Sequence, residues 1–356
     1  MDSLIQDILE IVDDYGVDNI FDQNIDFESV YNWAIQFKEE DREFLLTELK
    51  FLLPKCYLSK ETVIDKLTSV FEKLRTDFNY DTVDGFLDDV YFLDCQDEEK
   101  SQDILLELVD DILEEEYDRS IDDCGTGRIR YWIYLDDILA SGGTYRHDLI
   151  DAIENYGEDE FLASDIKVIG IFFIVHTWGL ENSKYALSRT FGNEIKEKLR
   201  FYKSKRVGNY PHINYYHPNP KFNHIYPIES DRGLEFLEFI ETAFEHNYPL
   251  KHEKLAFRKS SYPLKESFFS CEENRNRYEE ILLEKGIEII NSIDQLSAKS
   301  IRPLGMTPPH FKTLGTGTHY FTWRNISNTC PLVFWWGTIG GNGWNPLFPV
   351  HNRGRH

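Results

Sequence analysis

The sequence predicts an α/β fold built on a parallel sheet. Three short segments are almost continuously apolar, as strands covered on both faces are. They are residues 90–93, 129–135 and 166–175. Each is followed by a segment whose apolar residues recur at helical spacing. These segments are residues 102–117, 145–156 and 183–201. Strands that alternate with helices favour a parallel sheet with right-handed crossovers, which we place in a core of residues 86–205.

Residues 1–85 precede this pattern and are predicted to form a mainly helical region. Apolar residues recur at helical spacing between residues 4 and 12 and between residues 44 and 52. A further helix is predicted for residues 60–76. Pro54 is expected to end the helix before it, because proline lacks the amide hydrogen and its ring clashes with the preceding turn.

Residues 206–356 are predicted to be an irregular α+β extension. Residues 207–232 hold four prolines among Asn, Tyr and His, a composition typical of a loop. Two helices and a strand are expected further on, at residues 234–246, 271–285 and 320–323. Ser270 and Glu273 form a capping-box pattern at the start of the second helix, and Gly286 is expected at its end. The tail is rich in glycine, proline and tryptophan and predicts short strands and turns.

The net charge of −25 is concentrated in the first part of the chain. Residues 1–150 hold 39 acids and 13 bases, whereas residues 151–356 hold 24 acids and 25 bases. An acidic surface repels a phosphate backbone, which argues against nonspecific nucleic-acid binding by the first part. Two interpretations stay open: a solvated acidic surface, which we favour, and docking of a basic protein or ribonucleoprotein.

The composition also indicates in which cellular compartment the protein is expected. No stretch reaches the roughly 20 apolar residues that a membrane helix needs, and the first residues lack the pattern of a signal peptide. The cysteines are odd in number and widely spaced, without a CxxC or zinc pattern. They are Cys56, Cys95, Cys124, Cys271 and Cys330. We expect reduced thiols in a cytoplasmic protein that does not contact a membrane.

The segment after the second predicted strand carries the chemistry. Asp136 and Asp137 follow that strand directly, at the carboxyl edge of the sheet where open α/β folds bind ligands. The next residues are Ala140, Ser141, Gly142, Gly143 and Thr144. The two glycines allow the backbone N–H groups to converge on an anion, and the following helix directs its positive end there. The carboxylates would repel a phosphate, so ribose hydroxyls and a divalent cation are the partners that fit them.

This segment resembles the signature of the type I phosphoribosyltransferases: an apolar strand, two acids, three residues, then Thr or Ser, Gly, any residue and Thr. The resemblance implies a sheet of that kind and a phosphoribosyl pyrophosphate site. Asp136 and Asp137 would contact the ribose 2- and 3-hydroxyls and hold Mg²⁺ indirectly, and residues 140–144 would bind the 5-phosphate. The alternative is an ordinary strand–turn–helix junction with an acidic rim.

The resemblance also implies an earlier loop for pyrophosphate, and residues 94–101 occupy the matching place. Lys100 and Ser101 are the candidates for contacts to pyrophosphate and its metal. Asp97, Glu98 and Glu99 depart from the family pattern, because acids stand where a diphosphate would bind. Three explanations stay open: Mg²⁺ bridges the charges, the loop lies elsewhere, or pyrophosphate is not the leaving group.

Aromatic residues gather in the tail, and they permit two interpretations. They could form a stacking pocket for a base, with Arg324 and Asn325 as polar anchors, or a small core, which we favour. The histidines of the proline-rich segment have no metal spacing and are interpreted as loop residues. They are His212, His217 and His224. The tail and the glycine loop together resemble a branch of bacterial phosphoribosyltransferase-like proteins associated with conflict and antiphage systems, including retron effectors.

The leading prediction is therefore an enzyme, a pentosyltransferase that binds a ribose-phosphate ligand with Mg²⁺, and in a defence setting a toxic effector. The alternative is a non-catalytic module on the same fold that senses a ligand or docks a partner. A homo-oligomer is what relatives with this fold lead us to expect.

Overall fold

The computed structural model describes residues 1–16, 24–97, 100–209, 222–243, 248–293, 298–337 and 343–349. The chain divides into two compact units. One combines Met1–Lys60 with Val207–His356, and the other is Glu61–Arg206. The sequence pattern predicts divisions after residues 85 and 205 instead. The structure groups residues 61–85 with the sheet, and it groups the first 60 residues with the C-terminal part of the chain.

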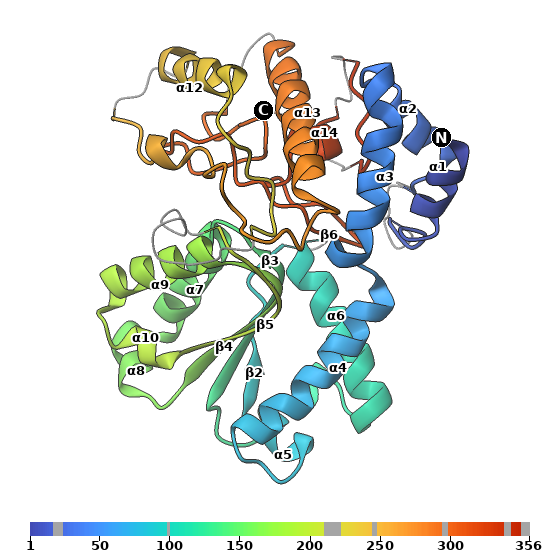
Figure 1. Ribbon diagram of the computed structural model, residues 1–356. Helices are drawn as coiled ribbons and strands as arrows, with labels where there is room; N and C mark the ends of the chain where they lie inside the picture. The colour runs from blue at the N-terminus through green and yellow to red at the C-terminus, as the bar shows by residue number, and fades with distance from the viewer. Residues whose placement is uncertain are drawn as a thin grey trace. The chain divides into compact units, whose positions relative to one another are not determined.

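The unit Glu61–Arg206 is a four-stranded sheet with helices on both faces (Figure 1). Its strands, in spatial order, are β2 (Val90–Phe92), β3 (Tyr131–Leu139), β4 (Lys167–His176) and β5 (Leu199–Val207). The first three are parallel, with Tyr131 opposite Val90 on one side and Lys167 on the other. One face is covered by α7 (Gly143–Tyr156), α8 (Glu158–Ala163), α9 (Thr177–Phe191) and α10 (Ile195–Lys198). The other face carries α4 (Lys60–Asp77) and α6 (Ser101–Tyr117). Two short helices complete the unit, α5 (Val83–Leu87) and the 3-10 helix η1 (Ile121–Asp123).

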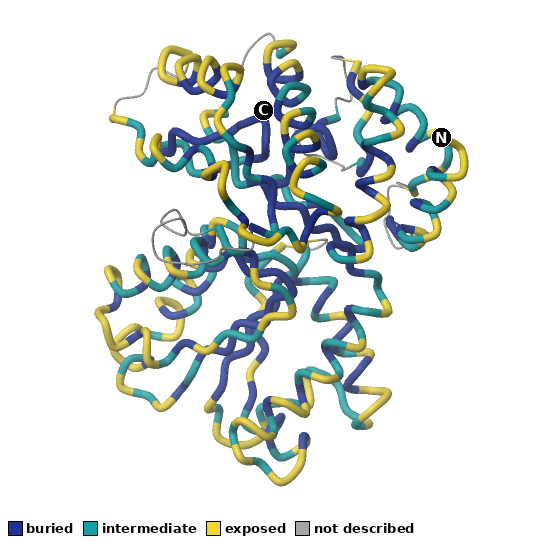
Figure 2. Tube along the Cα trace, viewed as in Figure 1, coloured by how far each residue is buried: buried dark blue, intermediate teal, exposed yellow. Residues whose placement is uncertain are grey.

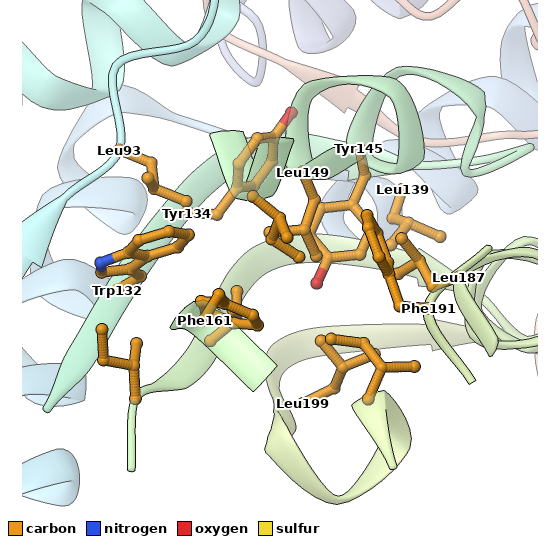
Figure 3. Close-up of a cluster of buried hydrophobic side chains, with 14 of the residues drawn as sticks. Leu93, Trp132, Tyr134, Leu139, Tyr145, Leu149, Phe161, Leu187, Phe191 and Leu199 are labelled. Atoms are coloured by element: carbon orange, nitrogen blue, oxygen red, sulfur yellow. The ribbon is translucent and has the colours of Figure 1, made fainter. Parts of the chain in front are cut away.

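The side chains of β3 alternate between the two faces of the sheet. Trp132 points into the cluster of Figure 3, where its ring lies 4.9 Å from that of Phe161. Tyr131 packs instead against Phe78 and Phe86, with ring centroids 4.4 Å and 5.3 Å away. The two central strands, β3 and β4, are buried along most of their length (Figure 2). Burial on both faces explains why the predicted strands read as continuous apolar runs.

The strands and helices at 90–93, 102–117, 145–156 and 166–175 are confirmed within a few residues. Three boundaries were wrong. β3 continues past the predicted end at Leu135, and α9 begins at Thr177 instead of Ser183. The helix expected to reach residue 201 ends at Phe191, and residues 199–207 form the strand β5.

The missed strand has a physical explanation. Phe191, Ile195 and Leu199 recur every four residues, which fits a helix. All three are indeed buried in the same core, but they come from the consecutive elements α9, α10 and β5. Gly192 follows α9 with a φ of 86°, a conformation that breaks the helix. Gly170 of β4 lies beside Phe201 and Thr177 beside Arg206, so β5 runs in the same direction as β4.

In its described residues, the other unit holds helices, one two-stranded sheet and long irregular segments. Its elements are α1 (Asp2–Leu9), α2 (Phe27–Ala34), α3 (Glu39–Cys56), β1 (Tyr57–Leu58), α12 (Asp231–Ala243), η2 (Glu253–Leu255), α13 (Glu272–Asn291), β6 (Phe321–Thr322) and α14 (Leu332–Trp335). β1 pairs with β6 in parallel, which confirms a strand near residues 320–323. The short helix α14 was not expected in the tail.

Two predicted helix ends in this unit were wrong. α3 continues past Pro54 to Cys56, where the Tyr57 amide donates to the Leu53 carbonyl. The buried apolar face of α3 extends through this turn and outweighs the bond that proline cannot make. α13 continues past Gly286 to Asn291. Gly286 packs against Pro303 there, so its lack of a side chain serves close packing inside the helix.

A buried ionic cluster and the aromatic tail hold this unit together. Arg275 and Glu279 are both fully buried, and their side chains pair at 3.0 Å. Glu279 also pairs with Arg258 at 3.1 Å, and Arg275 with Glu266 at 2.5 Å.

The rings of the tail pack on one another and on Trp33. They include Phe321, Phe334 and Phe348, all buried.

The five cysteines are free thiols. Within the described ranges, none of the helices has the length and apolar character required to cross a bilayer.

Candidate functional site

The end of β3, the loop after it and the start of α7 form the strand–loop–helix junction that the sequence predicts. Asp136 and Asp137 lie in the last part of β3, and residues 140–142 form a bend before α7 begins at Gly143. Gly142 precedes α7 with φ 75° and ψ 11°, the left-handed conformation that favours glycine. The chain therefore turns sharply from strand into helix directly after the two acids.

The backbone of this loop can bind an anion. Among the described residues, no acceptor pairs with the amides of Ser141, Gly142 and Thr144. The Gly143 amide has a weak contact of 3.3 Å with the Ser141 hydroxyl. Ser141 and Thr144 are exposed, so their hydroxyls can also reach a ligand. Unpaired amides at the positive end of a helix are the usual protein site for a phosphate.

Asp136 is the most electrostatically perturbed group of the loop. Its side chain is almost entirely buried, whereas Asp137 is half-buried. Burial, followed by the charge of Asp137, holds the pKa of the Asp136 carboxyl well above its usual range. Two hydrogen bonds act to lower this pKa. The Ser101 hydroxyl and the Asp137 amide donate to Asp136 Oδ1 at 2.7 Å and 2.8 Å. A cation or a ribose hydroxyl pair at this position would favour the charged carboxylate.

The structure brings Ser101 to the acid pair, as its contact with Asp136 shows. Ser101 is the first residue of α6, and Lys100 precedes it as an exposed residue in extended conformation. The acids that depart from the family pattern are only partly described. Asp97 is exposed, and Glu98 and Glu99 lie outside the described residues. The amino end of α6 is therefore a second helix terminus beside the acids.

Two glutamines hold the loop after β2 in place, and the sequence pattern did not indicate either of them. Gln102 is fully buried, and its Nε2 donates to the Leu135 carbonyl at 3.3 Å while its Oε1 accepts from the Cys95 amide at 2.7 Å. Gln96 Nε2 donates to the Tyr134 hydroxyl at 2.9 Å. The Tyr134 hydroxyl in turn donates to Asp148 Oδ2 at 2.7 Å. Gln102 thus joins the loop after β2 to the strand that carries the acids.

The glycine loop also packs directly against α9. A Cβ on Gly179 would lie 1.9 Å from the Ala140 carbonyl oxygen, and a Cβ on Gly142 would lie 1.9 Å from Ser183 Oγ. The Ser183 hydroxyl is within 3.1 Å of the Gly142 carbonyl and 2.9 Å of the Gly179 carbonyl. A glycine just after an apolar strand was the available signal for this contact. The sequence alone does not show that Gly179 contacts the glycine loop, because this contact depends on α9 packing beside α7.

The donor groups near the acid pair determine whether Mg²⁺ could bind there. Among the described residues, no group of three or more His, Cys, Asp or Glu side chains could hold a metal by itself. Mg²⁺ is commonly bound by one or two carboxylates together with substrate oxygens and water. The acid pair fits that mode, since a nearby cation would offset the charge repulsion between Asp136 and Asp137.

The predicted base anchors Arg324 and Asn325 lie in the other unit. Asn325 Oδ1 accepts from the Ile326 amide at 2.8 Å, and the Asn325 amide contacts Thr322 Oγ1 at 3.3 Å. These bonds shape a turn after β6. Of the loop histidines, His224 is buried, and His212 and His217 lie outside the described residues.

A parallel α/β sheet with an acid pair and a glycine loop on one strand is compatible with the phosphoribosyltransferase-like class. The family model named PRTase-CE matches residues 30–350, and the chain belongs to this family. The family name indicates a phosphoribosyltransferase-like protein. No curated protein and no solved structure matched the chain.

Proposed function

We propose that the chain binds phosphoribosyl pyrophosphate, or another ribose 5-phosphate ligand, together with Mg²⁺ at the end of β3. The observation that carries the proposal is the placement of two acids on the strand that leads into a loop of unpaired amides. The amides of residues 141–144 and the start of α7 would bind the 5-phosphate. Asp136 and Asp137, which lie in β3 just before this loop, would bind the ribose hydroxyls.

The reaction would be transfer of the phosphoribosyl group. The bond from ribose C1 to pyrophosphate breaks as a bond to the acceptor forms, and positive charge develops on the sugar ring. When bound, Mg²⁺ would neutralise charge on the leaving group. The protein's own contribution is positional: the acid pair and the amide loop hold the sugar at two points, so that its C1 faces the acceptor. Asp136 and Asp137 would also stabilise the developing positive charge.

The loop before α6 favours a second candidate function. Asp97 is exposed next to the exposed Lys100, so this loop offers both charges to a diphosphate. A ligand-sensing module that binds the ribose phosphate without turnover would need no strong pyrophosphate site. Measuring pyrophosphate release over a panel of nucleobases separates the two functions, because the sensing module releases none.

Binding is tested by calorimetric titration of phosphoribosyl pyrophosphate with Mg²⁺. The double variant Asp136→Asn, Asp137→Asn should weaken binding at least 100-fold, since charge-assisted bonds to the ribose and the link to Mg²⁺ are lost. Asp151→Asn is the matched control, because Asp151 lies on α7 and pairs with His147 at the surface. Binding that is absent in the wild type, or equal in the double variant, refutes the proposal.

The resemblance to the conflict-associated branch leads us to propose a role as a toxic effector in antiphage defence. The test expresses the wild type and the double variant in bacteria and compares growth and phage plaque formation. If the double variant is as toxic as the wild type, the toxic role does not depend on this site.

A further inference from the structure

The edge of the sheet away from the acid pair borders a groove. It has a volume of about 730 Å³ and lies between α4 and β5. α4 contributes Asp65, Lys66, Leu67, Ser69, Val70, Lys73 and Asp77 to its walls. Residues 171–173 of β4 and 200–204 of β5 complete the lining. All of these residues belong to the unit Glu61–Arg206.

β5 is one of the two edge strands of the four-stranded sheet. It neighbours β4 on one side, and among the described residues no strand pairs with its other side. An edge strand presents a row of backbone N–H and C=O groups that can pair with another extended chain. The groove therefore runs beside a strand that can accept a further one.

The charge of β5 is opposite to that of the chain as a whole. The strand holds Arg200, Lys203, Lys205 and Arg206 and no acid, in a chain whose net charge is −25. Arg200, Lys203 and Arg206 are exposed. Cations on an edge strand disfavour pairing with a second copy of the same strand, because like charges would face each other. The same cations attract a strand that carries acids.

The groove favours a peptide over a nucleic acid. A single strand of nucleic acid needs open aromatic faces on which its bases stack. Neither aromatic residue of β5 offers such a face: Phe201 packs against the core cluster, and Tyr202 donates to Asp77 at 2.7 Å with the Lys73 ammonium 5.8 Å from its ring centroid. The apolar part of the lining, such as Leu67 and Val70, suits the side chains of a peptide.

We propose that β5 and the adjoining groove bind an extended, acidic segment of a partner protein, which adds a strand to the sheet. Main-chain hydrogen bonds along the edge hold the segment, and its acidic side chains pair with the cations of β5. Apolar side chains of the segment enter the groove beside α4. This interaction is independent of the proposed ribose-phosphate site.

The probe is a fluorescein-labelled peptide of four Glu-Val repeats, and its binding is measured by fluorescence anisotropy. The peptide should bind the wild type, and Lys203→Glu should weaken it at least tenfold. Arg189→Glu is the matched control, because Arg189 is an exposed residue of α9 outside the groove. Its affinity should stay within twofold of the wild type. A peptide with N-methyl groups at alternate residues should also bind at least tenfold more weakly, because it cannot form the edge hydrogen bonds.

Three results overturn the proposal. The peptide fails to bind, it binds both charge variants equally, or a Lys-Val peptide binds as tightly. A single-stranded oligothymidine of equal charge that binds more tightly than the peptide, and that Lys203→Glu weakens, would assign the groove to nucleic acid instead. Each variant is first checked for an unchanged circular dichroism spectrum and melting temperature.

Discussion

Gly179→Ala tests whether the packing of α9 sets the position of the glycine loop, residues 140–144. The new Cβ would lie 1.9 Å from the Ala140 carbonyl oxygen, and Cβ contacts below 3.0 Å essentially never occur. The loop and α9 must therefore separate by about 1.1 Å at this contact. Overpacking of this kind costs about 1–3 kcal/mol of stability. A displacement near 1 Å of groups that position a ligand can cost about 100-fold in function.

The assay measures two quantities on each variant: the free energy of unfolding from urea titration, and the dissociation constant for phosphoribosyl pyrophosphate with Mg²⁺. The matched control is Gly192→Ala, which makes the same chemical change just after α9. Gly192 has a φ of 86° and nothing within 4 Å of its ideal Cβ. Backbone strain there costs about 1–3 kcal/mol without touching the loop. The two variants should thus lose similar stability.

Ligand affinity separates the two variants. Gly179→Ala should weaken binding by about 10- to 100-fold, and Gly192→Ala should leave it unchanged within twofold. Equal affinities in the two variants would refute the reasoning that α9 positions the loop. A Gly179→Ala protein as stable as the wild type would show that the Ala140 carbonyl can move freely.

Three further predictions concern buried polar groups. Gln102→Leu leaves the Cys95 amide and the Leu135 carbonyl without the Gln102 side chain, at about 1–3 kcal/mol each, and urea unfolding should show a loss of about 2–6 kcal/mol. Burial lowers the pKa of His319 to about 3. The unfolded chain gains a proton there below about pH 6.5, so this histidine alone should lower the unfolding free energy by about 2 kcal/mol between pH 6.5 and 5. His319→Phe should flatten the measured pH dependence by that amount; an unchanged slope contradicts it. Arg275→Met leaves the carboxylates of the ionic cluster uncompensated and should cost about 3–5 kcal/mol, whereas a loss below 1 kcal/mol would mean that they are solvated.

The sequence predicted the sheet well because its strands are buried on both faces. Continuous apolar runs then mark β2, β3 and β4 with little ambiguity. β5 was not predicted because it lacks this burial. As an edge strand it exposes Arg200 and Lys203, and its apolar residues fit the helical spacing of the preceding segment. The helix ends predicted at Pro54 and Gly286 were wrong, because tertiary packing decides where a buried helix stops.

The acid pair and the glycine loop could be predicted because they are contiguous in the chain. Their order along one strand and into one helix fixes their relative placement. Gln102, Gly179 and Ser183 could not be predicted, because their roles depend on which elements become neighbours. Each contacts a backbone carbonyl of β3 or its loop from a helix that is remote in sequence. Chain order cannot specify these contacts, which depend on the packing of helices on the sheet.

The energetics of Asp136 connect the fold to the proposed binding. A buried carboxyl beside a second carboxyl opposes folding when both are charged, because its folded pKa lies above its unfolded value. The stability of the free protein therefore decreases as the pH rises above the unfolded pKa of Asp136. A ligand that supplies a cation or hydroxyl donors removes this penalty in the folded state only. Part of the proposed binding energy would then come from relief of this electrostatic penalty, which would link the burial of Asp136 directly to affinity.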